Sequence, residues 1–413
     1  MSTPPEPIII EPNGDLLLHV RQQQSDAGFR YRVDSKVLRQ NSRYFDNLLS
    51  DRFAEGQEVS KALEKLKSLG YATPADALPE ELPSISIQDV GRISKVSSIE
   101  NLVADFLRIL HNKQISPYPP LANVANIAIV ADRFDAVASC ADYIGRKKYI
   151  EYLDAKSKVK SAAPPEERIR QKLLVGLLFD FPAWVSSCSK HLILRGSSQW
   201  KADFEEDDTL PLWWNIPEGV EDEMIQRREL ILETINSLQA HFLKLYSDKG
   251  QGRQCKLGYD SSAQCDSFQL GEMVRFFVKG GTLRLQGTIY DPSEPTYHQG
   301  DIERLILSLR EISAYQIDRF HAHCGIRVRI LPLLDMIERR CSPQSGRSGI
   351  DICATCWKSC RSSYAWTLAK RPVLWMPAPP KGRAEVGPCG NAHTPVREMF
   401  MATDRMWTNK DGY

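Results

Sequence analysis

The stretch from Phe29 to Gly56 constrains the fold most, because its apolar period changes abruptly along the chain. Three apolar side chains first alternate with polar ones, the pattern of a half-buried strand: Phe29, Tyr31 and Val33. Asp34 and Ser35 then offer side-chain oxygens that can cap a helix. Apolar residues next recur at helical spacing: Val37, Leu38, Tyr44, Phe45, Leu48 and Leu49. The stretch therefore predicts a strand that runs directly into a pair of short helices.

Four further segments complete a small sheet with helices around it. Asp15–Val20 (DLLLHV) follows an Asn-Gly turn signal and is typical of a buried strand. Residues 83–90 (PSISIQDV) alternate again and predict a further strand. Residues 102–115 and 121–144 gather their apolar side chains on one helical face. These segments predict an α+β fold for the first third of the chain.

The order and residues of these segments resemble the BTB (POZ) domain, a protein-interaction domain, and are closest to its fungal branch. The resemblance rests on these motifs: Tyr31-x5-Val37-Leu38, Ser42-x-Tyr44-Phe45-x-x-Leu48-Leu49, Ala128-x-x-Ala131-Asp132 and Cys140-x-x-Tyr143-Ile144. It covers residues 14–150 and implies a small sheet flanked by helices. Within such a domain, Cys140 is expected to be a core thiol rather than a nucleophile.

The resemblance also implies two places where a partner would bind. In the family, an aspartate on the first core strand, here Asp15, faces a basic residue across a ligand groove. In this chain Ser35 takes the place of the basic residue and Lys36 stands one position later. In cullin-binding BTB proteins a hydrophobic-x-Glu motif follows the second core helix, and Phe53-Ala54-Glu55 stands in that position. The resemblance thus implies these partner-binding residues: Phe53, Glu55, Leu49, Asp15 and Lys36.

The sequence outside residues 14–150 resembles no family that we recognise. We expect the following division: a disordered tail at 1–13, an insertion with one short helix at 57–83 inside the BTB domain, a mainly helical segment at 156–250, a mixed α/β region at 251–340 and a Cys- and Pro-containing tail at 341–413. In the mixed region, a helix is expected around 268–278 and strands within 282–290, residues 302–317 are amphipathic, and residues 325–337 are expected to begin as a strand and continue as a helix. The resemblance implies that dimers form through a helix and a strand ahead of the core, and the thirteen residues before Gly14 are too few for both, so we expect a monomer or a weak homodimer.

Ten cysteines are scattered along the chain, and one group has a spacing suited to a metal. Cys353-x-x-Cys356-x-x-x-Cys360 brings thiolates close enough for one zinc ion. The fourth ligand remains open among Cys341, Cys389 and His393. A looser alternative combines Cys255, Cys265 and Cys324 with His321 or His323. The sequence does not require a cofactor, and zinc is the one that these cysteines favour.

Charge, the N-terminal segment and the lack of catalytic motifs reduce the number of function classes that we expect for this chain. The net charge is +1 and no strongly basic stretch occurs, so we expect neither nucleic-acid binding nor membrane association. The N-terminus lacks the features of a signal peptide, which favours the cytoplasm or the nucleus. No nucleophile motif, carboxylate pair or phosphate-binding loop is found, so we do not expect an enzyme. The sequence instead predicts an interaction protein that binds other proteins. A substrate adaptor for a cullin-based ubiquitin ligase is the first hypothesis, and a transcription-associated scaffold is the alternative; a metal-dependent catalyst is a third.

Overall fold

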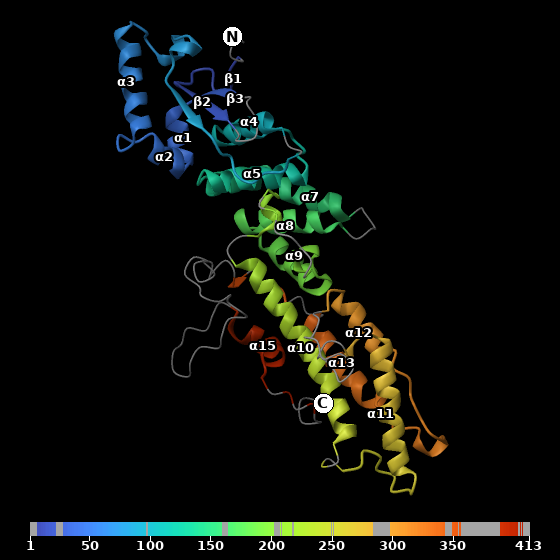
Figure 1. Ribbon diagram of the computed structural model, residues 1–413. Coiled ribbons are helices and arrows are strands. Elements are labelled where there is room, and N and C mark those ends of the chain that lie inside the picture. The colour runs from blue at the N-terminus through green and yellow to red at the C-terminus, as the bar shows by residue number, and fades with distance from the viewer. Residues whose placement is uncertain are drawn as a thin grey trace. The chain divides into compact units, whose positions relative to one another are not determined.

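A computed structural model gives the arrangement of the chain (Figure 1). The structure describes these residues: 6–21, 28–95, 98–158, 164–201, 207, 209–216, 219–248, 250, 252–283, 298–342, 349–353, 355–356, 389–403, 405 and 407. The chain divides into two compact units. The N-terminal unit comprises Met1–Val185 with Glu206–Ile216, and the C-terminal unit comprises Ser186–Glu205 with Pro217–Tyr413. The described residues mix a small sheet with many helices, in agreement with the α+β prediction.

The sheet of the N-terminal unit has the order β1-β3-β2-β4. β2 (Leu16–Arg21) and β3 (Gly28–Val33) form an antiparallel hairpin in which Leu18 faces Tyr31. β4 (Ser84–Ile87) lies parallel to β2 on its other side. The strands predicted from alternation are therefore present.

Two short helices follow β3, and side-chain caps define where each begins. Asp34 accepts a hydrogen bond from Val37 N at the start of α1 (Ser35–Asn41). Ser42 accepts one from Phe45 N at the start of α2 (Arg43–Leu48) and donates its own hydroxyl hydrogen to Phe134 O. Such caps satisfy backbone groups that have no partner within the helix. They fix the sharp change of direction between the two helices.

Longer helices cover the sheet and extend the unit (Figure 1). α4 (Ile99–Leu110) packs on β3, and α5 (Leu121–Arg133) and α6 (Val137–Arg146) pack on α4. α7 (Tyr149–Lys158) follows α6, and α8 (Glu166–Leu178) packs on α5. α9 spans Pro182–Arg195, and from Ser186 onward it belongs to the C-terminal unit. The contact of α8 with α5 explains why the first unit extends beyond residue 150.

The insertion is an ordered part of the N-terminal unit. Its helix α3 spans Ala54–Ser68, so it begins earlier than the prediction from residue 57. Two short helical turns follow at Pro74–Asp76 and Pro79–Glu81. A small apolar cluster joins the insertion to β2: Leu17, Leu66, Ala77 and Leu82, with Leu63 and Tyr71 at its edge. The insertion thus covers the face of β2 that carries Leu17, and the sheet has apolar cover on both faces.

The expectation of a disordered tail at 1–13 is wrong for its described part. Ile8–Ile9 form β1, which pairs in parallel with Tyr31 and Arg32 of β3. Ile10 is buried, and the Ile10 N–H donates to Arg32 O. The segment from Ile8 to Ile10 therefore completes an edge of its own sheet, because that edge offers both backbone partners and apolar cover.

In the C-terminal unit, α10 (Val220–Ser247) is the longest helix among the described residues. Figure 1 shows α15 (Thr394–Phe400) on one side of α10 and α11 (Ser262–Lys279) on the other, and both pack on it. α12 (Ile302–Arg310) packs on α13 (Arg327–Cys341). Short helical turns of this unit stand at Ser198–Trp200, Arg319–His321 and Gly390–His393, and the turn at Leu212–Trp214 belongs to the N-terminal unit.

The prediction of a mixed α/β region at 251–340 is wrong for the residues described there, which form helices and turns. The strand expected from residue 325 is not formed, whereas the helix expected after it is present as α13, because Ile330, Leu334 and Ile337 recur at helical spacing and are buried. The strand expected within 282–290 falls almost wholly on residues 284–297, which lie outside the described residues.

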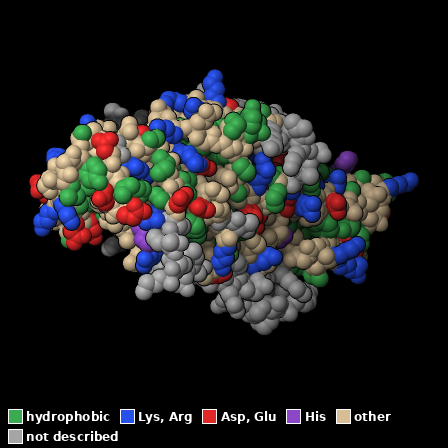
Figure 2. Space-filling model, turned by 90° about the horizontal axis from the view of Figure 1, so that it is seen from above, with side chains coloured by type: hydrophobic (Ala, Val, Ile, Leu, Met, Phe, Trp, Pro, Cys, Tyr) green, Lys and Arg blue, Asp and Glu red, His purple; other side chains and the backbone are tan. Residues whose placement is uncertain are grey.

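Charges are mixed on the molecular surface. On the face drawn in Figure 2, acidic and basic side chains are interspersed, in keeping with the net charge of +1. Among the described residues, no helix combines the length and apolar character that a membrane crossing requires.

His111, at the end of α4, provides a pH test of the N-terminal unit. His111 Nε2 accepts from Asp34 N at 3.0 Å, and Nδ1 lies 2.8 Å from Leu107 O, so the neutral ring with its proton on Nδ1 satisfies both contacts. Burial lowers the pKa of His111 below its ordinary value of 6.5. As the pH falls, His111 is therefore protonated in the unfolded chain before it is protonated in the folded unit. The free energy of unfolding of the N-terminal unit decreases once the pH falls below this ordinary pKa.

We expect the free energy of unfolding of the N-terminal unit to fall as the pH drops from about 7.5 to about 5.5, and His111→Gln to reduce this slope. Glutamine can keep both hydrogen bonds but does not titrate. Urea denaturation at several pH values measures the slope for both proteins. Equal slopes for the wild type and the variant would contradict the assignment.

Candidate functional site

Asp15 and Ser35 meet across the first predicted partner-binding place. Ser35 N and Ser35 Oγ each donate to the Asp15 carboxylate at 2.7 Å. Lys36 is exposed, and no ion pair joins it to Asp15 within the described residues. The structure thus pairs the aspartate with a neutral hydroxyl and a backbone N–H. Asp15 is therefore occupied in fixing the start of α1.

At the second predicted partner-binding place, one residue is buried in the core and two residues are exposed. Leu49 is only 5% exposed, so its prediction as a partner-binding residue is wrong: it packs in the core of its own unit. Phe53 is 48% exposed and Glu55 is exposed. Phe53 is the N-cap residue of α3, and Glu55 lies in the first helical turn, where a carboxylate interacts favourably with the helix dipole.

Gly56 fixes the position of the backbone that carries Phe53 and Glu55. A Cβ atom at Gly56 would lie 2.1 Å from Ser50 O, far inside van der Waals contact. Only glycine allows the first turn of α3 to approach the end of α2 so closely. The position of Phe53 and Glu55 is therefore set by a tight backbone contact rather than by a free loop.

A cysteine and histidine cluster is the most chemically distinctive site of the C-terminal unit. The side chains of Cys353, Cys356, Cys389 and His393 place all their ligand atoms within 4.8 Å of one another. Cys353 Sγ lies 3.5 Å from Cys389 Sγ, and Cys356 Sγ lies 3.2 Å from His393 Nε2. Cys356 and His393 are buried, and the other two residues are half-buried. The cluster offers three sulfur ligands and one nitrogen ligand.

Hydrogen bonding within this cluster favours a thiolate. The Cys356 thiol donates to Cys353, which lowers the pKa of Cys353 to about 3 and raises the pKa of Cys356 above its ordinary range. Burial is the largest cause that raises the pKa of Cys389. Thiolate is the form in which cysteine binds a metal.

The structure shows which of the candidate metal ligands named in the sequence analysis lie close to Cys353 and Cys356. Spacing alone favours Cys360 as the third ligand, but Cys360 lies outside the described residues. Cys389 and His393 both join Cys353 and Cys356, whereas Cys341 ends α13 and is not in the cluster. The C-x-x-x-H spacing of residues 389–393 is the sequence signal that could have paired the last two ligands.

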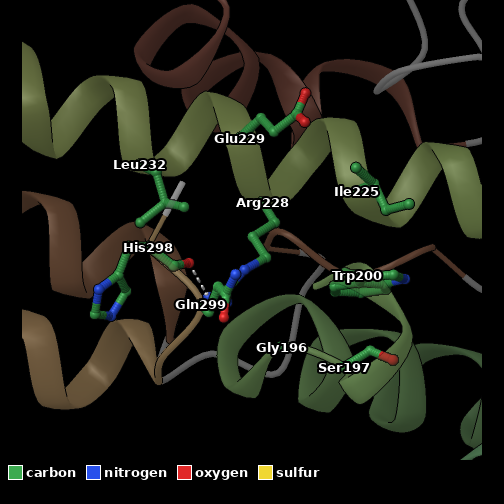
Figure 3. A pocket seen from close by; sticks show the side chains of 9 residues that line it. All are labelled: Gly196, Ser197, Trp200, Ile225, Arg228, Glu229, Leu232, His298 and Gln299. Atoms are coloured by element: carbon green, nitrogen blue, oxygen red, sulfur yellow. Dashed lines mark hydrogen bonds between the residues drawn. The ribbon is translucent and has the colours of Figure 1, made fainter. Parts of the chain in front are cut away.

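Arg228 lines one side of a cavity of about 80 Å³ beside α10, where its guanidinium group has a structural role (Figure 3). Arg228 Nη1 donates to Ile193 O and Leu194 O in the last turn of α9, and Nη2 donates to His298 O and Gly300 O. Burial lowers the pKa of Arg228 to about 10, so the side chain stays charged at neutral pH. Arg228 thus satisfies carbonyls at the helix end, and we assign no ligand to this cavity.

No protein-family model, no curated protein and no solved structure matches this chain.

Proposed function

We propose that this chain is an interaction protein whose N-terminal unit is a BTB-type module. The order of its elements supports the proposal: a β2–β3 hairpin, the helix pair α1 and α2, then β4 parallel to β2, and then α4 to α6. The sequence resemblance implies the same succession of strands and helices. The proposal assigns binding of other proteins to the unit, and no catalytic step.

We further propose that the chain is a substrate adaptor for a cullin-based ubiquitin ligase. One observation carries this step: Phe53 is 48% exposed although it stands at a tightly fixed helix start. An exposed aromatic ring on a rigid backbone can bury a large area with little loss of entropy. The neighbouring Glu55 supplies an acceptor for basic or backbone donors of the partner.

Cullin copurification tests the adaptor role. The full chain is expressed with an affinity tag, and cullin recovery is measured by quantitative mass spectrometry. We expect Phe53→Ala with Glu55→Ala to abolish recovery, because the double change removes both the apolar anchor and the carboxylate. The thermal unfolding curve should change little, since both side chains are exposed and an exposed carboxylate at a helix start contributes only a small stabilisation.

The insertion offers a matched control with the same hydrophobic-x-acid pattern. Leu78 and Glu80 are both exposed, and Leu78→Ala with Glu80→Ala should leave cullin recovery intact. Equal recovery with the Phe53 and Glu55 variant, or no recovery with the wild type, would refute the adaptor role. The alternative, a BTB-type scaffold or transcription-associated regulator without ligase activity, would then be preferred.

A further inference from the structure

We propose that the C-terminal unit binds two zinc ions, one at Cys353, Cys356, Cys389 and His393 and the other at Cys255, Cys265, Cys324 and His321. The two clusters use different residues and different elements of the unit, so each is argued from its own geometry. The proposal concerns the C-terminal unit and does not depend on the adaptor role.

The distances in the first cluster suit a tetrahedral ion. Zinc bonds of about 2.3 Å to sulfur and about 2.0 Å to nitrogen give tetrahedral edges of about 3.8 Å between sulfurs and about 3.5 Å between sulfur and nitrogen. The observed values are 3.5 Å for Cys353 Sγ to Cys389 Sγ and 3.2 Å for Cys356 Sγ to His393 Nε2. A disulfide would need about 2.05 Å, and the described cysteines are free. Small outward shifts would therefore admit an ion.

The donor set favours zinc in a structural role. Three thiolates and one imidazole match the Cys₃His sites in which zinc is tetrahedral and no position stays open for a substrate. Ligands that come from two distant segments would close a long loop of chain, which is where a metal contributes most to stability.

Neighbouring contacts hold the first pair of ligands in place. Arg227 on α10 donates to Ile350 O and to Asp351 O. Ser189 Oγ accepts from Ile352 N at 2.9 Å, directly before Cys353. The second pair precedes α15, which packs on the same helix α10. Both halves of the cluster are thus tied to one rigid element, so the ligands are held close together before an ion binds.

The second cluster is carried by independent observations. Cys255, Cys265 and Cys324 place their sulfur atoms within 4.8 Å of one another, and Cys255 Sγ lies 3.7 Å from Cys324 Sγ. This distance is close to the edge of about 3.8 Å that a zinc–thiolate tetrahedron requires. Asp266 accepts from Cys255 N at 2.8 Å, which ties the Cys255 turn to α11.

His321 is the candidate for the fourth ligand of the second cluster, although it stands outside the group of three cysteines whose sulfur atoms all lie within 4.8 Å of one another. The His321 side chain is buried, and Cys324 N donates to His321 O at 3.1 Å, which ties the histidine to the turn that carries Cys324. His321 Nδ1 contacts the Asp318 carboxylate at 2.9 Å, which leaves Nε2 on the side where Ser261 Oγ lies 3.5 Å away. A carboxylate that orients a histidine in this way is the usual second-shell partner of zinc-binding histidines. His323, the other histidine offered by the sequence, has no such partner in the described structure.

Metal content tests both sites. The full chain is purified under reducing, chelator-free conditions, and zinc is counted by elemental analysis and native mass spectrometry. We expect about two zinc ions per chain in the wild type, about one in Cys356→Ser or in Cys265→Ser, and none in the double variant. Cys341→Ala is the matched control, because this buried thiol lies outside both clusters, and it should retain both ions.

Cobalt substitution of the wild type avoids variants that fold poorly. Cobalt at either site should give the strong visible bands of tetrahedral coordination together with thiolate-to-cobalt charge transfer. One ion that is lost in Cys356→Ser but retained in Cys265→Ser would overturn the second site alone, and the reverse pattern would overturn the first. A wild type that carries no metal and binds neither zinc nor cobalt on titration would overturn both. Iron with sulfide in place of zinc would overturn the metal assignment.

Discussion

Phe45→Ala is expected to lower the free energy of unfolding of the N-terminal unit by about 3–5 kcal/mol. Phe45 is 1% exposed, and its ring stacks on Phe134 with centroids 5.4 Å apart. Tyr44 meets both rings edge-on. Truncation would remove the burial and leave a cavity, because Ser42 anchors the start of α2 to Phe134 O and limits collapse. Such a loss approaches the whole stability of many domains.

Phe53→Ala is the matched control for this prediction. The same substitution at a side chain that is 48% exposed should change stability by less than about 0.5 kcal/mol. Denaturant unfolding, followed by hydrogen exchange on peptides of residues 28–146, assigns the change to the N-terminal unit. A Phe45 variant as stable as the wild type would mean that the core described around Phe134 is wrong.

Arg227→Ala is expected to lower the free energy of unfolding of the C-terminal unit by about 3–5 kcal/mol. Arg227 and Glu223 are each 1% exposed, and Arg227 Nη2 lies 2.6 Å from Glu223 Oε1. Removal of Arg227 would leave a buried carboxylate without its cation. It would also take the donors from Ile350 O and Asp351 O, next to the first cysteine cluster. Urea denaturation monitored by exchange on α10 peptides measures the loss.

Protonation of Glu223 gives this prediction a second signature. Desolvation already raises the pKa of Glu223, and Arg227 opposes the rise. Without Arg227 the folded state would bind a proton more readily than the unfolded chain, so stability should fall as the pH rises. The loss in Arg227→Ala should therefore be larger at about pH 8 than at about pH 5, and Glu223→Leu with Arg227→Met should recover much of it.

An exposed ion pair in the same unit provides the control for Arg227. Arg275 pairs with Glu272 at 3.1 Å, but the Arg275 side chain is 81% exposed. Arg275→Ala should therefore change stability by less than about 0.5 kcal/mol. If Arg227→Ala had an equally small effect, or an effect independent of pH, the buried pair would not be an anchor of the C-terminal unit.

Local features of the N-terminal unit could be predicted from the sequence because they depend on neighbouring residues. Alternation places the strands, and the capping side chain of Asp34 starts α1 where the pattern predicts a helix. The start of α3 was harder to predict, because it depends on the close approach of Gly56 to Ser50 O. The burial of Leu49 likewise follows from packing, not from its position in a motif.

The candidate metal centres depend on contacts between distant segments, which a single sequence does not reveal. Cys353 and Cys356 have a recognisable spacing, but Cys389 and His393 join them only through the packing of α15 on α10. Cys255, Cys265 and Cys324 lie at spacings that fit no short motif. The buried Arg227 shows the same limit, since its carbonyl partners lie far along the chain.

Direct titration of the purified full-length chain with a purified cullin tests the central claim most directly. Calorimetry on the wild type should show saturable binding of one cullin per chain. The Phe53→Ala, Glu55→Ala double variant should give no binding heat, while the Leu78→Ala, Glu80→Ala variant should bind like the wild type. Absence of binding by a folded wild-type chain, or equal binding by the Phe53 and Glu55 variant, would contradict the account.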